Sequence, residues 1–292
     1  MSPSRILVFG KVGQIGWELR RTLAPLGDLV CVDFPEVDFT RPDSIRQWIR
    51  DTVPDIIVNA AAYTAVDKAE SATALALQIN GEAPGIMADE AKRRGALLVH
   101  YSTDYVFDGA KTTPYVEEDA PNPLGAYGRS KLAGDTALAQ VGGRHLIFRL
   151  CWVYGPRGNN FMLTMIRLAR ERETLRIVHD QTGCPTPARL IAETTALALQ
   201  AARAGGPADG ASGVFHLCCA GGTSWHGFAS AIIEQLPAAG RKCRTVEAIT
   251  SAEYPTPARR PAYSVMSCAK LQRTFGLALP GWRDGLRLVL ET

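Results

Sequence analysis

One stretch near the start of the chain decides the fold, and it reads Ile6-Leu7-Val8-Phe9-Gly10-Lys11-Val12-Gly13-Gln14-Ile15-Gly16. The first four residues form an apolar run of strand length, and the residues after the last glycine carry apolar side chains at helical spacing. A glycine-rich turn of this kind brings the backbone close to a pyrophosphate, which the free amides of a helix N-terminus attract. Such turns also occur for purely structural reasons, so the rest of the chain must decide between the two interpretations.

Further along the first half, short apolar runs alternate with stretches of helical spacing. The apolar runs predict strands over residues 5–9, 29–32, 56–59, 97–102 and 145–150. The spacing predicts helices over residues 14–26, 42–52, 72–94 and 127–140. Because long crossovers between parallel strands are right-handed, this order predicts an α/β fold with a Rossmann-type, doubly wound parallel sheet.

After about residue 152 the pattern changes. Prolines become more frequent, an isolated strand is expected over residues 214–217, and helices are expected near residues 161–172, 190–203 and 227–235. We predict that residues 1–152 form the main part of a dinucleotide-binding Rossmann domain. Residues 153–292 should form mainly a smaller substrate-binding lobe, with some segments returning to the Rossmann sheet.

Composition and charge narrow the class of protein. A chain of 292 residues with 46% hydrophobic residues can bury a large core. Its 32 basic and 29 acidic residues are dispersed, which predicts small-molecule partners and neither nucleic acid nor a membrane. The first apolar run is too short for a signal segment, so we expect a cytoplasmic protein. The seven cysteines lack the spacing of a zinc site and predict free, structural thiols.

Several residues after the glycine turn suit a dinucleotide. Asp33 follows the second strand at the distance expected for a carboxylate that binds the adenosine ribose, although a surface turn would also explain it. Asp33 favours NADH, because a carboxylate repels the additional phosphate of NADPH, whereas Lys11 favours NADPH; the cofactor can be either. We expect Asp38 and Phe39 to border the adenine. The alanine-rich stretch that closes the third strand can admit the middle of the cofactor, beside Ala62, Tyr63 and Thr64, although packing at the strand end would also explain its alanines.

The strongest chemical signal is the spacing of Tyr127 and Lys131. Residues four apart share one face of a helix, so both side chains can point into one cleft. Tyrosine, with an unperturbed pKa near 10, becomes a useful proton donor when a cation lowers its pKa, and Lys131 is expected to do this. Thr103, at the end of a core strand, can hold a carbonyl oxygen beside the phenol. The alternative is a tyrosine and a lysine on an ordinary helix surface.

Together these residues resemble the extended short-chain dehydrogenase/reductase superfamily, and within it the dTDP-4-dehydrorhamnose reductases. The resemblance runs almost from end to end, and the segments that carry it are residues 9–19, 58–70, 100–107, 127–134, 149–154, 158–161 and 254–261. It implies reduction of the C4 ketone of dTDP-4-dehydro-β-L-rhamnose to dTDP-β-L-rhamnose by NADPH or NADH. This reaction is the last step in making the rhamnose donor for surface polysaccharides.

The resemblance also implies roles at matching positions. Those that would contact the dinucleotide are Gly10, Lys11, Gly13, Gln14, Ile15, Gly16, Asp33, Asp38, Phe39, Ala62, Tyr63, Thr64, Tyr127 and Lys131. Catalysis would fall to Thr103, Tyr127 and Lys131, and contact with the dTDP-sugar to Thr103, Asp104 and Trp152. Trp152 can equally be a buried tryptophan at a lobe boundary. Asn160 can reach a diphosphate or be an ordinary helix N-cap. Arg259 and Arg260 suit either a nucleotide diphosphate or an ion pair at the rim.

One position departs from the resemblance. Relatives that bind magnesium at a dimer contact have a glutamate where this chain has Arg189, while Glu18 and Glu291 occupy the other corresponding positions. A cation there opposes a metal ion, so we expect no metal site and not that particular dimer, although a homodimer of another kind is compatible with the sequence.

Three alternatives share the fold. Epimerases of nucleotide sugars carry the same Tyr and Lys pair, and so do 4,6-dehydratases, which follow the catalytic threonine with Asp and Glu. Here the third position is Tyr105, which leaves no carboxyl group there to eliminate water. A non-catalytic NADP-binding regulatory subunit is a rival of another class, and the intact Thr103, Tyr127 and Lys131 argue against it.

Overall fold

The apolar run at residues 6–9 lies inside β1 (Ser4–Phe9), an inner strand of a parallel sheet with a neighbour on each side. Ile6 and Val8 pack into the core on one face of this sheet, and Leu7 and Phe9 pack into the core on the other. All four side chains are fully buried, which is typical of a strand covered by helices on both faces. The structure is a computed structural model that describes residues 3–203, 206 and 208–291.

Six strands of the described chain form this sheet, in the order β10-β5-β4-β3-β1-β2, and all of their pairings are parallel. The others are β2 (Gly27–Val32), β3 (Ile56–Asn59), β4 (Leu97–Thr103), β5 (His145–Leu150) and β10 (Gly213–His216). The prediction of an α/β, doubly wound parallel sheet is therefore confirmed. The predicted strands at 56–59 and 145–150 match residue for residue, and the rest differ by one or two residues at an end.

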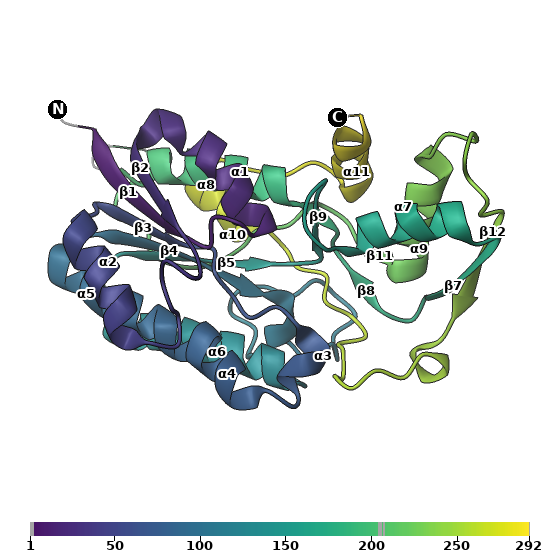
Figure 1. Cartoon of the computed structure of the whole chain (residues 1–292), viewed down its shortest axis with the longest axis horizontal. Helices are drawn as coiled ribbons and strands as arrows, with labels where there is room; N and C mark the ends of the chain where they lie inside the picture. The colour runs from purple at the N-terminus through teal and green to yellow at the C-terminus, as the bar shows by residue number, and fades with distance from the viewer. Residues whose placement is uncertain (1–2, 204–205, 207, 292) are drawn as a thin grey trace.

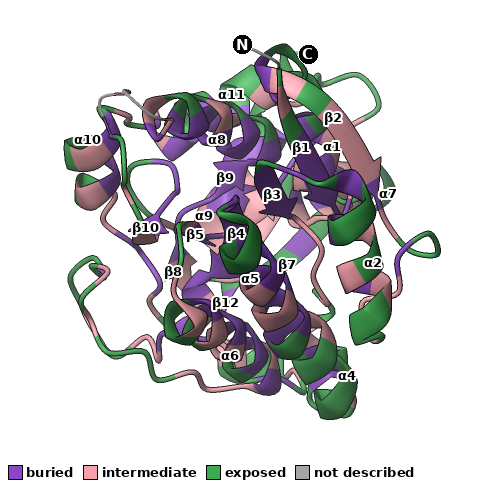
Figure 2. Ribbon diagram, turned by 90° about the vertical axis from the view of Figure 1, so that its left-hand side faces the viewer, coloured by how far each residue is buried: buried purple, intermediate pink, exposed green. Residues whose placement is uncertain are grey.

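Helices cover both faces of the sheet (Figure 1). One face carries α1 (Gln14–Thr22), α8 (Ala188–Ala201) and α10 (Ala269–Phe275). The other carries α2 (Pro42–Thr52), α4 (Thr73–Leu77), α5 (Ala83–Arg94) and α6 (Ala126–Val141), with the short α3 (Val66–Ala69) beside them. Figure 2 shows the buried residues concentrated on the strands and on the inner faces of these helices.

The expected helix over residues 72–94 is interrupted. It consists of α4, a π-helical turn over Gln78–Glu82, and α5. Pro84 lies one turn after Asn80 and has no N–H to donate, and its ring would collide with the carbonyl group of a regular α-helix. The wider π turn avoids this collision. It also leaves the Asn80 side chain free to bond both the N–H and the C=O of Tyr63. The first helix also ends early, before a 3-10 turn at Ala24–Leu26 that contains Pro25.

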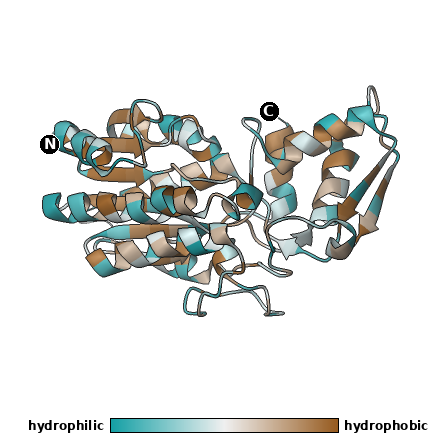
Figure 3. Cartoon of the chain, turned by 60° about the horizontal axis from the view of Figure 1, so that its bottom comes forward, coloured by the Kyte–Doolittle hydropathy of each residue, from teal (hydrophilic) through white to brown (hydrophobic). Residues whose placement is uncertain are grey.

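The second half of the chain contributes to both parts of the molecule. β10 extends the sheet beside β5, and α8 packs against α1. A smaller lobe, visible as a separate body in Figure 3, contains α7 (Phe161–Glu171), α9 (Trp225–Gln235), β7 (Thr174–Val178) and β12 (Thr245–Ile249). Its short strands are β6 (Val153–Tyr154), β8 (Thr182–Gly183), β9 (Thr186–Pro187) and β11 (Thr223–Ser224), and α11 (Trp282–Leu290) follows later in the chain. The division into folding units at residue 152 stays a prediction.

None of the described helices has both the length and the apolar character needed to cross a membrane. All seven cysteines are free thiols, as the sequence predicts.

Candidate active site

The glycine turn joins β1 to α1 and has the shape that a dinucleotide requires. Gly10 adopts a φ of +88°, and a Cβ there would lie 2.5 Å from the backbone of Ala60 at the end of β3. A Cβ at Gly16 would lie 1.9 Å from the carbonyl oxygen of Gly10. Gly13 is the N-cap of α1, and no described side chain caps the first amides of this helix. These amides are therefore free for a phosphate group.

Asp33 fixes the turn from the neighbouring strand. Its carboxylate accepts hydrogen bonds from the N–H groups of Val12, at 2.9 Å, and Phe34, at 2.8 Å. Lys11 extends away from the turn and pairs with Glu36, with 2.6 Å between Nζ and Oε2. The Lys11 cation is thus already neutralised by a carboxylate, whereas Asp33 has no cationic partner among the described ion pairs. This arrangement leaves a negative charge at the position expected for the adenosine ribose.

A cavity of about 730 Å³ begins at this turn and extends to the ends of β4 and β5. It brings together most of the residues predicted from the sequence, namely Gly10, Gly13, Gln14, Ile15, Asp33, Phe39, Ala62, Thr64, Thr103, Asp104, Tyr127, Lys131 and Trp152. Four predicted residues are not among its described lining residues. Lys11 pairs with Glu36, and Gly16 packs against the backbone of Gly10. The Asp38 carboxylate accepts hydrogen bonds from Thr40, and Tyr63 packs against a cluster of alanines.

At the inner end of this cavity Thr103 and Tyr127 lie together. Thr103 is the last residue of β4, and Tyr127 lies in the first turn of α6, whose N-cap is Gly125. Burial raises the pKa of Tyr127 to about 12, and a hydrogen bond with Thr103 opposes this rise. Tyr105 packs edge to face on the Tyr127 ring, with 5.8 Å between the ring centroids. The phenol is therefore protonated at neutral pH and fixed in place.

Lys131 lies beside Tyr127 on α6, but its ammonium nitrogen has other partners. Nζ donates a hydrogen bond to the carbonyl oxygen of Tyr101 at 2.6 Å and lies 3.3 Å from Nε2 of His100. Burial lowers the pKa of Lys131 to about 8, against the opposing effect of Asp135. The expectation that Lys131 lowers the pKa of Tyr127 is therefore not met in this arrangement, because burial dominates the ionisation of both groups.

Asp104 is almost fully buried next to Thr103. Its carboxyl group accepts hydrogen bonds from the Thr103 hydroxyl, at 3.1 Å, and the Cys151 thiol, at 3.1 Å. Burial raises the pKa of Asp104 to about 6, and these hydrogen bonds, with one to Ser264, oppose the rise. The side chain lines the cavity but is almost completely shielded from water. A carboxyl group in this position suits the binding of a sugar hydroxyl.

Trp152 lies where β5 passes into the second lobe. Its backbone adopts a φ of +44°, a left-handed conformation that is rare for a bulky residue and costs of order 1–3 kcal/mol. Its ring stacks on Trp225 with 3.5 Å between centroids and 6° between planes. The absence of a side chain at Gly183 makes room, because a Cβ there would lie 2.5 Å from the Trp152 ring. Trp152 is thus half-buried in a stack rather than in the core.

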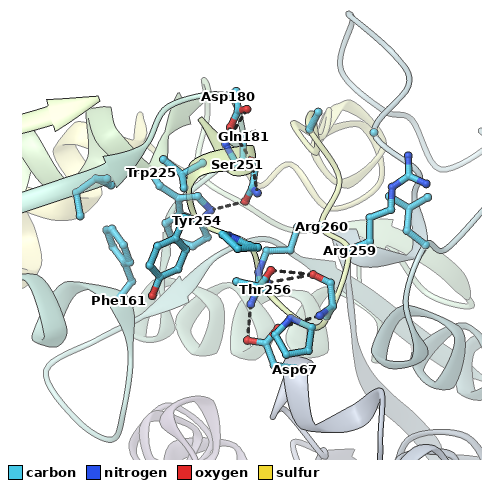
Figure 4. A pocket seen from close by; sticks show the side chains of 18 of the residues that line it. Asp67, Phe161, Asp180, Gln181, Trp225, Ser251, Tyr254, Thr256, Arg259 and Arg260 are labelled. Carbon is cyan, nitrogen blue, oxygen red and sulfur yellow. Dashed lines mark hydrogen bonds and ion pairs between the residues drawn. The ribbon is translucent and has the colours of Figure 1, made fainter. Parts of the chain in front are cut away.

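A second, larger cavity of about 1210 Å³ is lined by residues of the smaller lobe and by Asp67, Asp108 and Asn122 from the first half of the chain, and it shares Trp225 with the first. Figure 4 shows Phe161, Trp225 and Tyr254 on one side of it and Arg259 and Arg260 on the other. Both arginines therefore line a cavity, as the interpretation that they bind a nucleotide diphosphate requires. Arg260 also forms an ion pair with Asp67 at 2.9 Å. It therefore both lines the cavity and takes part in an ion pair.

Asn160 is the helix N-cap that the sequence allows, and its contact with a diphosphate stays a prediction. Its side-chain oxygen accepts the N–H of Leu163 and caps α7, while its amide nitrogen donates to Gln14 at 2.9 Å in the wall of the first cavity. Sequence reasoning missed three residues at the site: Phe34, Tyr105 and Trp225. Phe34 is 69% exposed beside Asp33, and an exposed aromatic residue next to a ribose-binding acid could have drawn attention to it. Nothing in the sequence places Trp225 against Trp152.

Arg189 on α8 contacts Glu18 on α1, with 3.6 Å between Nε and Oε2. Glu18 is only 6% exposed, so this guanidinium is the cation that balances a buried carboxylate. Within residues 3–203, 206 and 208–291, no group of three or more acidic, histidine or cysteine side chains is arranged to hold a metal ion.

Comparison with known proteins gives one consistent result. Residues 4–292 match the family described as RmlD substrate binding domain. A dTDP-4-dehydrorhamnose reductase of Burkholderia thailandensis is 52% identical, over 98% of each chain, and one of Escherichia coli (strain K12) is 45% identical, over 98% of this chain and 97% of that protein. A crystal structure of dTDP-4-dehydrorhamnose reductase from Bacillus anthracis, in complex with NADP, superposes with a TM-score of 0.91 at 34% identity over 100% of both chains.

Proposed function

The chain belongs to the dTDP-4-dehydrorhamnose reductases with the RmlD substrate binding domain, and from this premise we propose that it reduces dTDP-4-dehydro-β-L-rhamnose to dTDP-β-L-rhamnose. NADPH or NADH would supply the reducing equivalents. The observation that carries the proposal is that one cavity contains the glycine turn at one end and Thr103, Tyr127 and Lys131 at the other. A dinucleotide bound to the turn therefore reaches the proton donor.

The residues around the glycine turn fit a dinucleotide. The uncapped amides of α1 suit its phosphates, and the missing side chains at Gly10 and Gly13 leave the backbone accessible. Asp33 suits the adenosine ribose, and Phe34 and Phe39 offer flat faces near it. Bound there, the reduced nicotinamide supplies the hydride that the C4 carbon accepts.

The other steps belong to residues of this chain. The Thr103 hydroxyl holds the ketone oxygen next to the Tyr127 phenol, and the phenol donates its proton to that oxygen as the carbon accepts hydride. The C4 hydroxyl group forms, and a phenolate remains on Tyr127 until it is reprotonated. Asp104 would bind a sugar hydroxyl, since it lies next to Thr103 in the wall of the same cavity.

We place the nucleotide part of the substrate in the larger cavity, of about 1210 Å³. Arg259 and Arg260 offer positive charge for the diphosphate, and Tyr254 and Phe161 offer apolar faces for the base. The Trp152 and Trp225 stack lies where the two cavities meet, so the sugar would lie against it. A homodimer, a cytoplasmic location and the absence of nucleic acid among the partners stay predictions.

The test is to supply dTDP-4-dehydro-β-L-rhamnose with NADPH or NADH and to follow the nicotinamide absorbance. We expect one nicotinamide oxidised per sugar, with dTDP-β-L-rhamnose as the product in the NMR spectrum. A product epimerised without net oxidation of added cofactor would contradict the proposal in favour of an epimerase. Cofactor binding without turnover would instead favour a regulatory subunit.

A further inference from the structure

A line of buried polar side chains runs from β3 through β4 to α6, and the proposed reaction uses only its last member. Asn59, His100 and Lys131 are 2%, 0% and 1% exposed, so bulk water does not reach them. Asn59 and His100 are register partners on adjacent parallel strands, which sets their side chains next to each other. Two of these three side chains are therefore buried at a cost that the reaction described above does not explain.

The hydrogen bonds of Asn59 decide where the proton of His100 lies. The Asn59 side-chain oxygen accepts the N–H of Ala61 at 3.1 Å, so its amide nitrogen is directed at Nδ1 of His100, 3.0 Å away. An amide nitrogen only donates, so Nδ1 must accept. Burial lowers the pKa of His100 well below its ordinary value, so the ring is neutral and carries one N–H. That proton must lie on Nε2.

The Nε2–H group meets the nitrogen of Lys131 at 3.3 Å. A lysine ammonium group has hydrogens and no lone pair, so it cannot accept from Nε2–H. The uncharged amine has a lone pair and can accept, while its own hydrogens still bond the carbonyl oxygen of Tyr101. His100 therefore favours the amine form of Lys131 over the ammonium form.

Other groups around this pair act on the same equilibrium. Asp135 on α6 favours the Lys131 cation, but Arg149 on β5 bonds Asp135 at 3.2 Å and offsets part of its charge. Tyr127 is neutral, and the Tyr101 hydroxyl is bonded to Thr195 with its pKa raised by burial. Among these neighbours, His100 is the one whose effect on the ionisation of Lys131 depends on which ring nitrogen carries the proton.

We propose that His100, held by Asn59 as the Nε2–H tautomer, is a positioning residue that stabilises the uncharged amine of Lys131. Resting on the proposed function, its role is to make the Lys131 ammonium release a proton more readily after Tyr127 has given its own to the ketone. The proton leaves Nζ for a water molecule of the cavity, which gives one of its own protons to the phenolate oxygen. The Lys131 nitrogen keeps the electron pair, and Nε2–H of His100 donates to that pair. Water then reprotonates the amine.

The first part of the test needs no substrate. Protein labelled with 15N-histidine contains five histidines, and His100 is assigned from the signals lost in His100→Gln. At pH 7 we expect Nε2 to carry the proton and Nδ1 to be bare, and the ring to stay neutral at acidic pH values where an exposed histidine is protonated. A proton on Nδ1, or a doubly protonated ring at pH 7, would overturn the inference.

The second part measures the ionisation of Lys131 by NMR of protein labelled with 13C-lysine, with the signal assigned by its loss in Lys131→Met. In His100→Gln the amide oxygen can turn to the ammonium, so we expect the pKa of Lys131 to rise by at least about 0.5. Asn59→Ser, which removes the donor to Nδ1, should raise it in the same direction and serves if the first variant does not fold. His216→Gln, at a second fully buried histidine on β10, should leave it unchanged. No rise in either test variant would overturn the inference.

The pH dependence of kcat tests whether the ionisation of Lys131, as measured by NMR, affects the reduction. In His100→Gln the alkaline limb of kcat should move to higher pH by the same shift that NMR reports for Lys131, and kcat at pH 7 should fall about 3–10-fold with KM nearly unchanged. An alkaline limb that stays in place while the lysine pKa moves would overturn the catalytic part of the inference. If the wild-type protein does not reduce the sugar ketone at all, the proposed function fails while the NMR result still decides the tautomer.

Discussion

At the scale of single residues, Tyr127 carries the clearest prediction. Tyr127→Phe keeps the ring and its edge-to-face contact with Tyr105 but removes the proton donor. We expect kcat to fall at least ~100-fold, with cofactor affinity within about twofold of wild type. Steady-state kinetics and a fluorescence titration with NADPH measure the two effects. A near-normal rate would show that another group donates the proton.

Asp33 determines the choice of cofactor. In Asp33→Asn the repulsion of the NADPH 2′-phosphate is removed while the ribose hydrogen bonds weaken, so the ratio of kcat/KM for NADPH over NADH should rise at least ~5-fold. Glu36→Gln frees Lys11 from its ion pair and should raise the same ratio, independently of Asp33. If the ratio stays constant in both variants, neither charge lies near the ribose.

The raised pKa of Asp104 makes the free energy of unfolding depend on pH. Its folded pKa of about 6 is above the ordinary value of 3.8, so between these values the folded protein binds more protons than the unfolded chain. Stability must then decrease as pH rises through this window. Asp104→Asn removes the titration, so the free energy of unfolding of wild type relative to this variant should fall by about 2–3 kcal/mol from pH 4 to pH 7, measured by urea unfolding. A difference that does not vary with pH would mean that folding does not shift the pKa of this carboxyl group.

At the scale of elements, the turn between β1 and α1 contains glycines with two different roles: close packing of the backbone at Gly16 and access for the cofactor at Gly13. Gly16→Ala places a Cβ against the carbonyl group of Gly10, so we expect both a lower Tm and a loss of NADPH affinity of at least ~10-fold. At Gly13 the nearest atom would be 3.6 Å from a new Cβ, an ordinary contact. Gly13→Ala should therefore keep its Tm and lose only affinity, because the side chain faces the cofactor. Equal Tm values for both variants would contradict this division.

The elements also show how far the sequence could predict the molecule. Strands such as β3 were predicted residue for residue, because a strand buried on both faces is apolar along its whole length. The π turn around Asn80 could not be predicted from periodicity, since it results from a proline inside an otherwise helical pattern. Tyr127, Lys131 and Thr103 were predicted because chain-local spacing and strand ends fix their positions. Trp225 depends on a contact between distant segments, and no local pattern encodes it.

The ionisation of Lys131 likewise depends on contacts that sequence spacing does not reveal. Its spacing from Tyr127 was visible in the sequence, but the direction of its nitrogen depends on the Tyr101 carbonyl and His100, two residues of β4. The effect of one charge on another depends on burial and direction, and both are properties of the folded chain.

At the scale of the whole molecule, the contact between α1 and α8 bears on metal ions and assembly. Arg189 already neutralises Glu18, and an arginine supplies no ligand to a dication. EDTA should therefore change neither the rate nor the mass measured by light scattering. Arg189→Glu is the matched control, since it creates the acidic pair and should make the protein respond to magnesium. If EDTA dissociates a dimer of the wild-type protein and magnesium alone restores it, another acid must supply the missing ligand.

The two stacked indoles of Trp152, which follows β5, and Trp225, which begins α9, lie 3.5 Å apart and nearly parallel. Chromophores this close share their excited states, so the pair should give a paired positive and negative band in the circular dichroism spectrum. Neither ring alone would produce this signal, and Trp225→Phe should abolish it. Because the coupling depends on the distance and angle between the rings, this band would report any displacement of α9 relative to the end of β5.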